Sequence, residues 1–308
     1  MMLSLKMFLL GLSISFYAMA THQPTSLKVI YGEDDRVEPY TVTDEKLLAV
    51  SNSVAAMIPV ADIKLPTSSR SSTTWGRGGD SQSSKKEVTV TAPTLSERNI
   101  CASERFSDQI TAANCSGFLV AEDVLITAGH CIEDQSDCDN FRWVFGYQVA
   151  ADGKLAKMTA NDVYECKKII GRELNDTGGD FAVIKLNKKV ANRTPMKLNL
   201  AGKPQLADEV IVLGHPTGLP QKIAGGAEVR KLEDIFFKAN LDTYGGNSGS
   251  PIINARTYEV EGILVRGAED YVAAPNAKCG ISNILSNDTI DAEQGSNISQ
   301  VFKTLGIN

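Results

Sequence analysis

The sequence predicts an all-β protein built as an antiparallel barrel or sandwich. Short runs rich in β-branched and aromatic residues follow one another, and glycine, asparagine, aspartate and proline separate them. Long helical periodicity is almost absent, because only the tail at 297–308 places Ile298, Val301, Phe302 and Leu305 at helical spacing. We therefore expect many short strands, closed into barrels or stacked as sheets, and one short packing helix at the end.

The strand-like runs lie on both sides of a segment of different composition. Residues 66–93 are rich in serine, threonine, glycine and charge, and such a stretch cannot bury enough apolar surface to offset its ordering entropy. We expect an exposed, mobile insertion at about 64–100. The runs that predict strands are, in chain order, SVAAMIPVADI, SGFLVAEDVLITAG, FRWVFGYQV, DVYECKKII, DFAVIKL, DEVIVLG, SPIIN and EVEGILVRG.

The first twenty residues, MMLSLKMFLLGLSISFYAMA, predict a secretory signal peptide. They hold one lysine, an apolar run and the small-x-small ending Ala18-Met19-Ala20. A membrane anchor is the alternative, but the apolar run is short for a span of about 20 residues. We expect an exported protein, extracellular or periplasmic, that does not bind a membrane once the signal is removed.

Composition excludes one class of partner. The chain has 308 residues, of which 43% are hydrophobic and 22% charged, and this length accommodates one large domain or two small ones. Its formal net charge is -6, so no basic field exists to attract nucleic acid.

The cysteine count favours disulfides. Six cysteines, an even number, follow the signal peptide of a chain that we expect to be exported. Zinc binding is the alternative, but there is no C-x-x-C pair and two of the three histidines have no cysteine nearby. We expect no metal and no cofactor.

The stretch DTYGGNSGSPI, residues 242–252, places three glycines and two serines around Asn247. Glycine permits tight turns and a close approach of backbone N–H groups to a bound atom, so this turn can form an oxyanion hole. A glycine-serine loop without chemistry is the alternative. A reactive serine here would need a base and a group that orients the base.

The base is expected among three histidines. His22 lies in the segment just behind the signal peptide, where a role in a packed site is not expected, and His215 in VLGHPTG is typical of a loop histidine. His130 ends the apolar run VLITAGHC, which places an imidazole at a rigid strand end beside a cysteine. Asp180, which opens the alternating run DFAVIKL, is the candidate carboxylate that orients it.

Taken together, these stretches resemble the chymotrypsin-like serine peptidases. The resemblance covers most of residues 115–267, and the order histidine, aspartate, serine is that of this family. The form G-N-S-G-S is similar to the bacterial branch that includes glutamyl endopeptidases and V8-type proteases. VIYGEDDR, at 29–36, is similar to the start of mature chains in that branch. Residues 21–28 would then be a propeptide of a zymogen.

The resemblance implies two antiparallel six-stranded β-barrels with the active site between them. It implies that Ser248 is the nucleophile, His130 the general base and Asp180 the residue that orients the base. The backbone N–H groups of Gly246 and Ser248 would form the oxyanion hole. A secreted, monomeric serine endopeptidase acting on proteins or peptides is expected; the alternative is a catalytically silent barrel that serves as a binding or adhesion module.

Three positions depart from the family pattern. Asn247 replaces the aspartate that pairs with a freed N-terminal amine in the digestive enzymes. Leu264 stands where glutamyl endopeptidases carry a histidine that binds an acidic side chain. Val265 stands where many relatives have a polar residue that hydrogen-bonds the buried aspartate.

The resemblance also implies a substrate pocket near the nucleophile, formed by Asp242, Thr243, Leu264, Arg266 and Gly267. An ionised Asp242 there would favour arginine or lysine in the substrate. Alternatively, this carboxylate turns away to backbone N–H groups or to Arg266.

A preference for cleavage after arginine or lysine would also allow the protein to process itself. Lys28 precedes the bond to Val29, so cleavage of this bond would remove residues 21–28.

One disulfide follows from the family, which commonly joins Cys115 to Cys131. The other four cysteines allow three connectivities. Cys138 and Cys166 flank a plausible hairpin, which would leave Cys101 with Cys279.

Overall fold

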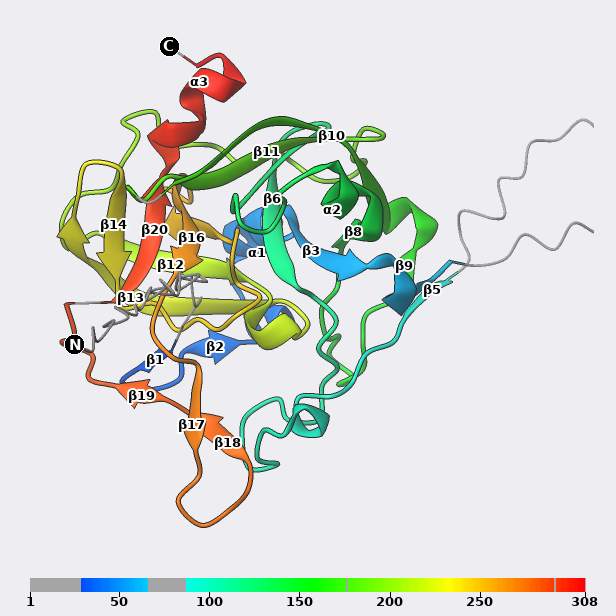
Figure 1. The fold of residues 1–308 in the computed structure, drawn as a ribbon, viewed down its shortest axis with the longest axis vertical. Helices are drawn as coiled ribbons and strands as arrows, with labels where there is room; N and C mark the ends of the chain where they lie inside the picture. Colours follow the sequence, from blue (N-terminus) through cyan, green and yellow to red (C-terminus); the bar gives the residue numbers. More distant parts are fainter. Residues whose placement is uncertain (1–28, 66–86, 176, 291, 308) are drawn as a thin grey trace, which may run out of the picture.

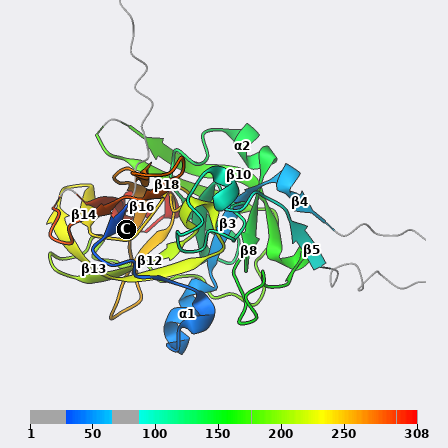
Figure 2. The same ribbon diagram turned by 90° about the horizontal axis from the view of Figure 1, so that it is seen from below.

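The computed structural model describes residues 29–65, 87–175, 177–290 and 292–307 (Figure 1). The expected signal peptide, the expected propeptide and most of the serine-rich stretch lie outside these residues. Within them, no helix is both long and apolar enough to cross a membrane. Two barrels lie side by side in both ribbon views, and the later one in the chain is on the left (Figures 1 and 2).

The first barrel closes through antiparallel pairs in the order β10-β11-β7-β6-β3-β8. The large apolar side chains of its strands, including Phe118, Trp143 and Phe145, are fully buried and form its core. Its strands are β3 (Val54–Pro59), β6 (Cys115–Ala121), β7 (Val124–Thr127), β8 (Phe141–Phe145), β10 (Val163–Leu174) and β11 (Asp180–Leu186).

The second barrel has the order β12-β15-β16-β20-β14-β13, and the β12–β13 pair closes it. Its strands are β12 (Glu209–Gly214), β13 (Lys222–Leu232), β14 (Phe236–Ala239), β15 (Pro251–Asn254), β16 (Val260–Arg266) and β20 (Glu293–Asn297). The short β2 (Arg36–Val37) adds to the edge of β13. Two closed six-stranded antiparallel barrels confirm the predicted fold class.

Smaller sheets lie outside the barrels. The N-terminal β1 (Ile30–Tyr31) pairs in parallel with β19 (Ile284–Leu285). A hairpin joins β17 (Tyr271–Ala273) to β18 (Gly280–Ser282), and a three-stranded sheet contains β4 (Ile63–Lys64), β5 (Glu87–Val90) and β9 (Met158–Thr159). The expected insertion at 64–100 is wrong at its C-terminal end, because β5 and the 3-10 helix Ser96–Arg98 lie inside it. The alternation in EVTV buries Val88 and Val90, which orders this segment.

The helices are short. The predicted C-terminal helix is present as η7 (Ile298–Val301), which buries Ile298 and Val301, followed by α3 (Phe302–Leu305). The α-helices elsewhere in the described ranges are α1 (Glu45–Ser51), with Asp44 as its N-cap, and α2 (Gln135–Asn140), with Asp134 as its N-cap. The further 3-10 helices are η1 (Pro39–Thr41), η2 (Val60–Asp62), η5 (Ala160–Asp162) and η6 (Pro216–Gly218).

The structure joins the cysteines in the three predicted pairs. Their Cα–Cα distances are 6.2 Å for Cys115–Cys131, 4.9 Å for Cys138–Cys166 and 5.0 Å for Cys101–Cys279. The first pair fixes the loop after β7 to the start of β6. That loop carries His130, so this disulfide anchors the candidate site.

Candidate active site

The glycine-rich turn lies between β14 and β15, and its backbone is fixed to the first barrel. Ser116 on β6 donates its N–H to the carbonyl oxygen of Ser248 at 2.8 Å. Gly249 has φ +85°, and a Cβ there would lie 2.2 Å from the Ser116 carbonyl oxygen. Glycine is therefore required after Ser248, because a side chain would separate the two barrels at their contact.

His130 and Asp180 form a hydrogen-bonded pair at neighbouring strand ends of the first barrel. His130 follows β7, Asp180 opens β11, and these strands pair with each other. Nδ1 of His130 lies 2.9 Å from Oδ2 of Asp180. Oδ1 of Asp180 accepts the N–H groups of Gly129 at 2.7 Å and of His130 at 3.1 Å. The carboxylate is thus held by the loop whose imidazole it orients.

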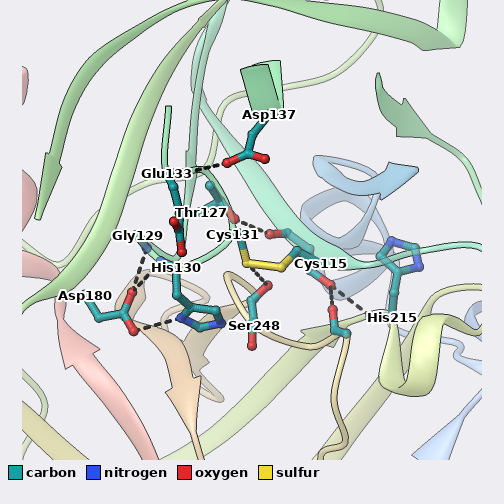
Figure 3. The surroundings of a disulfide bond; sticks show 12 residues. Cys115, Thr127, Gly129, His130, Cys131, Glu133, Asp137, Asp180, His215 and Ser248 are labelled. Carbon is teal, nitrogen blue, oxygen red and sulfur yellow. Dashed lines mark hydrogen bonds and ion pairs between the residues drawn. A yellow bond between two sulfur atoms is a disulfide. The ribbon is translucent and has the colours of Figure 1, made fainter. Parts of the chain in front are cut away.

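The imidazole lies between the carboxylate and the serine. Figure 3 shows the ring of His130 with Nδ1 toward Asp180 and its other nitrogen on the side of Ser248. The sulfur of Cys131 lies 3.7 Å from the Ser248 carbonyl oxygen, so the disulfide packs against the same turn. A donated Nδ1–H leaves Nε2 as the acceptor, which is the tautomer that a general base needs. The structure thus brings together the three residues that the sequence predicts.

The three residues that depart from the family pattern have different surroundings. Val265 is fully buried and offers no hydrogen bond to Asp180 from its side chain. Next to it, the guanidinium of Arg266 lies 3.8 Å from Oδ2 of Asp180. Arg266 therefore pairs with Asp180, so the branch of the alternative in which Asp242 turns to Arg266 is not the one observed.

Asn247 lies inside the turn. Its N–H donates to the Tyr244 carbonyl oxygen at 3.0 Å, and its side-chain oxygen lies 3.4 Å from the Ser250 hydroxyl. This residue is buried. It therefore stabilises the turn through local contacts.

Asp242 turns its carboxylate toward the N-terminal segment of the described chain. Its two carboxylate oxygens accept the backbone N–H groups of Tyr31 at 2.8 Å and of Asp35 at 2.7 Å. Burial is the main cause that raises the pKa of Asp242 to about 7. The geometry matches the alternative in which this carboxylate turns to backbone N–H groups, and it does not fit the pocket role.

A different carboxylate lies against the predicted pocket residues, and sequence reasoning missed it. Glu293 on β20 accepts hydrogen bonds from the Thr243 hydroxyl and from the Ala268 N–H, the latter at 3.2 Å. A Cβ on Gly267 would lie 2.0 Å from both of its oxygens. Thr243 and Gly267 therefore share Glu293 as a neighbour. The predicted pocket residue Leu264, in contrast, points into the core of the second barrel.

A polar cavity of about 390 Å³ borders His130 on another side. Its lining includes the Cys115–Cys131 disulfide and the carboxylates of Glu133, Asp134 and Asp137. Cys115, His130 and Cys131 also offer ligand atoms within 4.8 Å of one another. Both sulfurs belong to the disulfide, so they are not thiolate ligands for a metal.

His215 lies apart from the pair. Its ring is fully buried and stacks on Tyr147 at 5.5 Å, and burial lowers its pKa to about 3. An imidazole with this pKa is neutral at physiological pH. Its Nδ1 lies 3.1 Å from the Leu219 carbonyl oxygen, which fits the predicted loop histidine.

Residues 115–263 match the family described as a trypsin-like peptidase domain. Among curated proteins, none matches the chain. A solved structure titled as a Glu endopeptidase in complex with MPD aligns with a TM-score of 0.50 and 16% sequence identity. The alignment covers 90% of this chain and 98% of that chain.

Proposed function

We propose that this chain is a chymotrypsin-like serine peptidase, a secreted endopeptidase that cleaves peptide bonds through an acyl-enzyme. The match of residues 115–263 to a trypsin-like peptidase domain supports this proposal. The observation that carries the proposal is the His130–Asp180 pair, 2.9 Å between Nδ1 and Oδ2, with Ser248 on the far side of the imidazole. The three disulfides are compatible with an oxidising compartment.

Each residue has a defined step in this mechanism. The hydroxyl oxygen of Ser248 attacks the substrate carbonyl carbon, and its proton moves to Nε2 of His130. Asp180 keeps the imidazole in the required tautomer and stabilises the imidazolium that forms. The N–H groups of Gly246 and Ser248 stabilise the negative oxygen of the tetrahedral intermediate. His130 then protonates the leaving amine, and a water molecule hydrolyses the acyl-enzyme by the reverse sequence.

A fluorophosphonate probe tests the chemistry directly. Native protein should be labelled at Ser248, whereas heat-denatured protein and Ser248→Ala should not be labelled. Ser248→Ala or His130→Ala alone should remove nearly all turnover, and the double variant should be hardly worse, because the residues act as a unit. A native protein without label would favour the alternative, a catalytically silent barrel that binds other molecules.

We further propose a preference for lysine or arginine before the cleaved bond, supported by Glu293 instead of Asp242. The carboxylate touches Thr243 and Gly267, and it is fully buried. A second carboxylate, that of Asp270, accepts the N–H of Gly245 at 2.8 Å, so another negative group lies at the same turn. A cationic side chain would gain charge-assisted hydrogen bonds from these groups.

We also propose that the protein matures by cleavage of the Lys28–Val29 bond, which has a lysine before the cleaved bond. Val29 is fully buried, and its carbonyl oxygen accepts the N–H of Thr243 at 3.2 Å. A bond next to a buried residue is poorly accessible, so cleavage would precede the docking of this segment. N-terminal sequencing of active protein should begin at Val29, and Ser248→Ala expressed without other proteases should keep Thr21.

A further inference from the structure

The loop that links β12 to β13 packs directly against the turn that carries the nucleophile. This loop comprises residues 215–221 and contains η6. A Cβ on Gly246 would lie 2.5 Å from the His215 carbonyl oxygen and 2.7 Å from the Gly218 nitrogen. The Ser116 hydroxyl accepts the N–H of His215 at 3.1 Å and donates to the Gly246 carbonyl oxygen at 2.9 Å. The loop and the turn are therefore in backbone contact.

One hydrogen bond in this contact sets the direction of a peptide group. The N–H of Thr217 donates to the carbonyl oxygen of Gly245. That oxygen and the N–H of Gly246 belong to the same trans peptide, so they point in opposite directions. Holding the oxygen toward Thr217 therefore turns the Gly246 N–H away from the loop.

The second oxyanion donor is oriented in the same manner but from within the turn. The N–H of Ser250 donates to the Asn247 carbonyl oxygen at 2.8 Å, which fixes the peptide whose N–H belongs to Ser248. The Ser248 donor thus depends on a local bond. The Gly246 donor depends on another loop.

We propose that Thr217 is a positioning residue, whose backbone N–H holds the Gly245–Gly246 peptide in the orientation that offers the Gly246 N–H to the substrate oxygen. The inference rests on the proposed peptidase function. It matters because Gly246 has φ +90° and lacks a side chain. A peptide between two glycines meets a low steric barrier to rotation, so an external contact has to fix it.

The backbone of Thr217 is itself unusual, and its surroundings support it. Thr217 has φ +53°, a conformation that is rare for a β-branched residue. Its hydroxyl lies 2.8 Å from the hydroxyl of Tyr271, whose ring packs on Tyr244 with centroids 4.9 Å apart. On the other side, the N–H of Gly218 donates to the His215 carbonyl oxygen at 3.0 Å. A conformation with a steric cost persists where such contacts enforce it.

Substitution of the two hydroxyl partners tests the inference. Thr217→Val keeps the shape and branching of the side chain but loses the hydroxyl, and Tyr271→Phe removes the partner hydroxyl. Each should lower kcat by about tenfold, less than the hundred- to thousandfold loss on deleting an oxyanion donor. KM should change little. Affinity for a peptide aldehyde, which forms a tetrahedral adduct, should fall by the same factor as kcat.

Two further variants separate positioning from packing. Thr217→Gly, which adopts positive φ without strain, should retain more activity than Thr217→Val, whereas a packing role predicts the reverse order. Tyr40→Phe, an exposed tyrosine outside the site, is the matched control for Tyr271→Phe. Wild-type kcat and aldehyde affinity in Thr217→Val, or a loss confined to KM, would overturn the inference while the peptidase function stands. Absence of turnover in the wild-type protein would overturn both.

Discussion

The two halves of the site are held together over very different distances along the chain. In the first barrel, Asp180 is hydrogen-bonded to Gly129 and His130, which are 51 and 50 residues away and on the adjacent strand end. In the second barrel, Asp242 accepts the backbone N–H of Tyr31, 211 residues away, and the Tyr31 hydroxyl donates to Glu293, 262 residues from Tyr31, at 3.4 Å. Strand neighbours thus build the His130–Asp180 pair, whereas remote segments build the surroundings of the turn that carries Ser248.

Both halves require glycine, but against different partners. Beside His130, a Cβ on Gly129 would lie 2.1 Å from the carbonyl oxygen of Glu173, on the strand that pairs with β11. Beside Ser248, Gly246 and Gly249 have no room for a Cβ because they contact the backbone of the loop between β12 and β13 and of the first barrel. The following experiments test whether the second half is the more sensitive one.

The largest effect is expected at Gly246. Gly246→Ala places a Cβ against the His215 carbonyl oxygen at a positive φ, so the oxyanion donor must move. We expect a loss of about a hundred- to a thousandfold in kcat with a native circular dichroism spectrum. Gly225→Ala is the control, because a Cβ there meets its nearest atom, on Ile211, at 3.8 Å. Equal kcat values for the two variants would contradict the steric argument.

A smaller effect is expected at Glu293. Glu293→Gln removes the charge that would bind a cationic side chain, and hydrogen bonds to charged groups contribute about 1.5–3 kcal/mol. The ratio of kcat/KM for lysine over leucine substrates should therefore fall about ten- to a hundredfold. Asp242→Asn should leave this ratio unchanged, since its carboxylate faces backbone N–H groups. If Asp242→Asn changes the ratio and Glu293→Gln does not, the original pocket assignment is right.

The smallest change in activity is expected for Asp242→Asn. This substitution should instead change how the free energy of unfolding depends on pH. The pKa of Asp242 is about 7 in the folded protein and 3.8 in the unfolded chain, so the folded state holds the proton more tightly. Protonation of Asp242 therefore stabilises the folded state. Its contribution to the free energy of unfolding is largest below about pH 4, decreases as the pH rises toward 7 and is lost above that pH. The total change is on the order of a few kcal/mol.

Urea unfolding in a Ser248→Ala background, which prevents self-digestion, measures this slope. Asp242→Asn should remove the decline between about pH 4 and 7, whereas Asp108→Asn, at an exposed position, should retain it. Identical pH profiles for wild type and Asp242→Asn would show that the group does not titrate in that window.

The features that the sequence predicted are marked by patterns in neighbouring residues of the chain. His130 ends a strand pattern, Asp180 begins one, and Cys115 precedes the strand pair that leads to His130. The family supplied the pairing with Cys131. His130, Asp180 and Ser248 lie next to one another, and the six cysteines form the three predicted pairs.

The parts that were not predicted depend on direction and on remote contacts. Counting back from Ser248 locates Asp242 in the sequence but does not show where its carboxylate points. Its direction is set by the backbone N–H groups of Tyr31 and Asp35, which are more than 200 residues away. Glu293 lies in EQGSN, a run without an apolar alternation, so no strand pattern marked it. Leu264 and Arg266 lie two residues apart on β16, where regular alternation would place both on one face. The irregularity between them, which the sequence pattern does not show, separates Leu264 in the core from Arg266 beside Asp180.

The docking of residues 29–37 has a consequence for biosynthesis. The ribosome makes Tyr31 more than 200 residues before Asp242, and Glu293 later still. The turn that carries Ser248 therefore lacks its supporting contacts until nearly the whole described chain has been synthesised. Contacts between distant segments form late in folding. If the proposed peptidase function holds, a nascent or truncated chain that contains His130 and Asp180 but lacks these contacts would be unable to digest its neighbours.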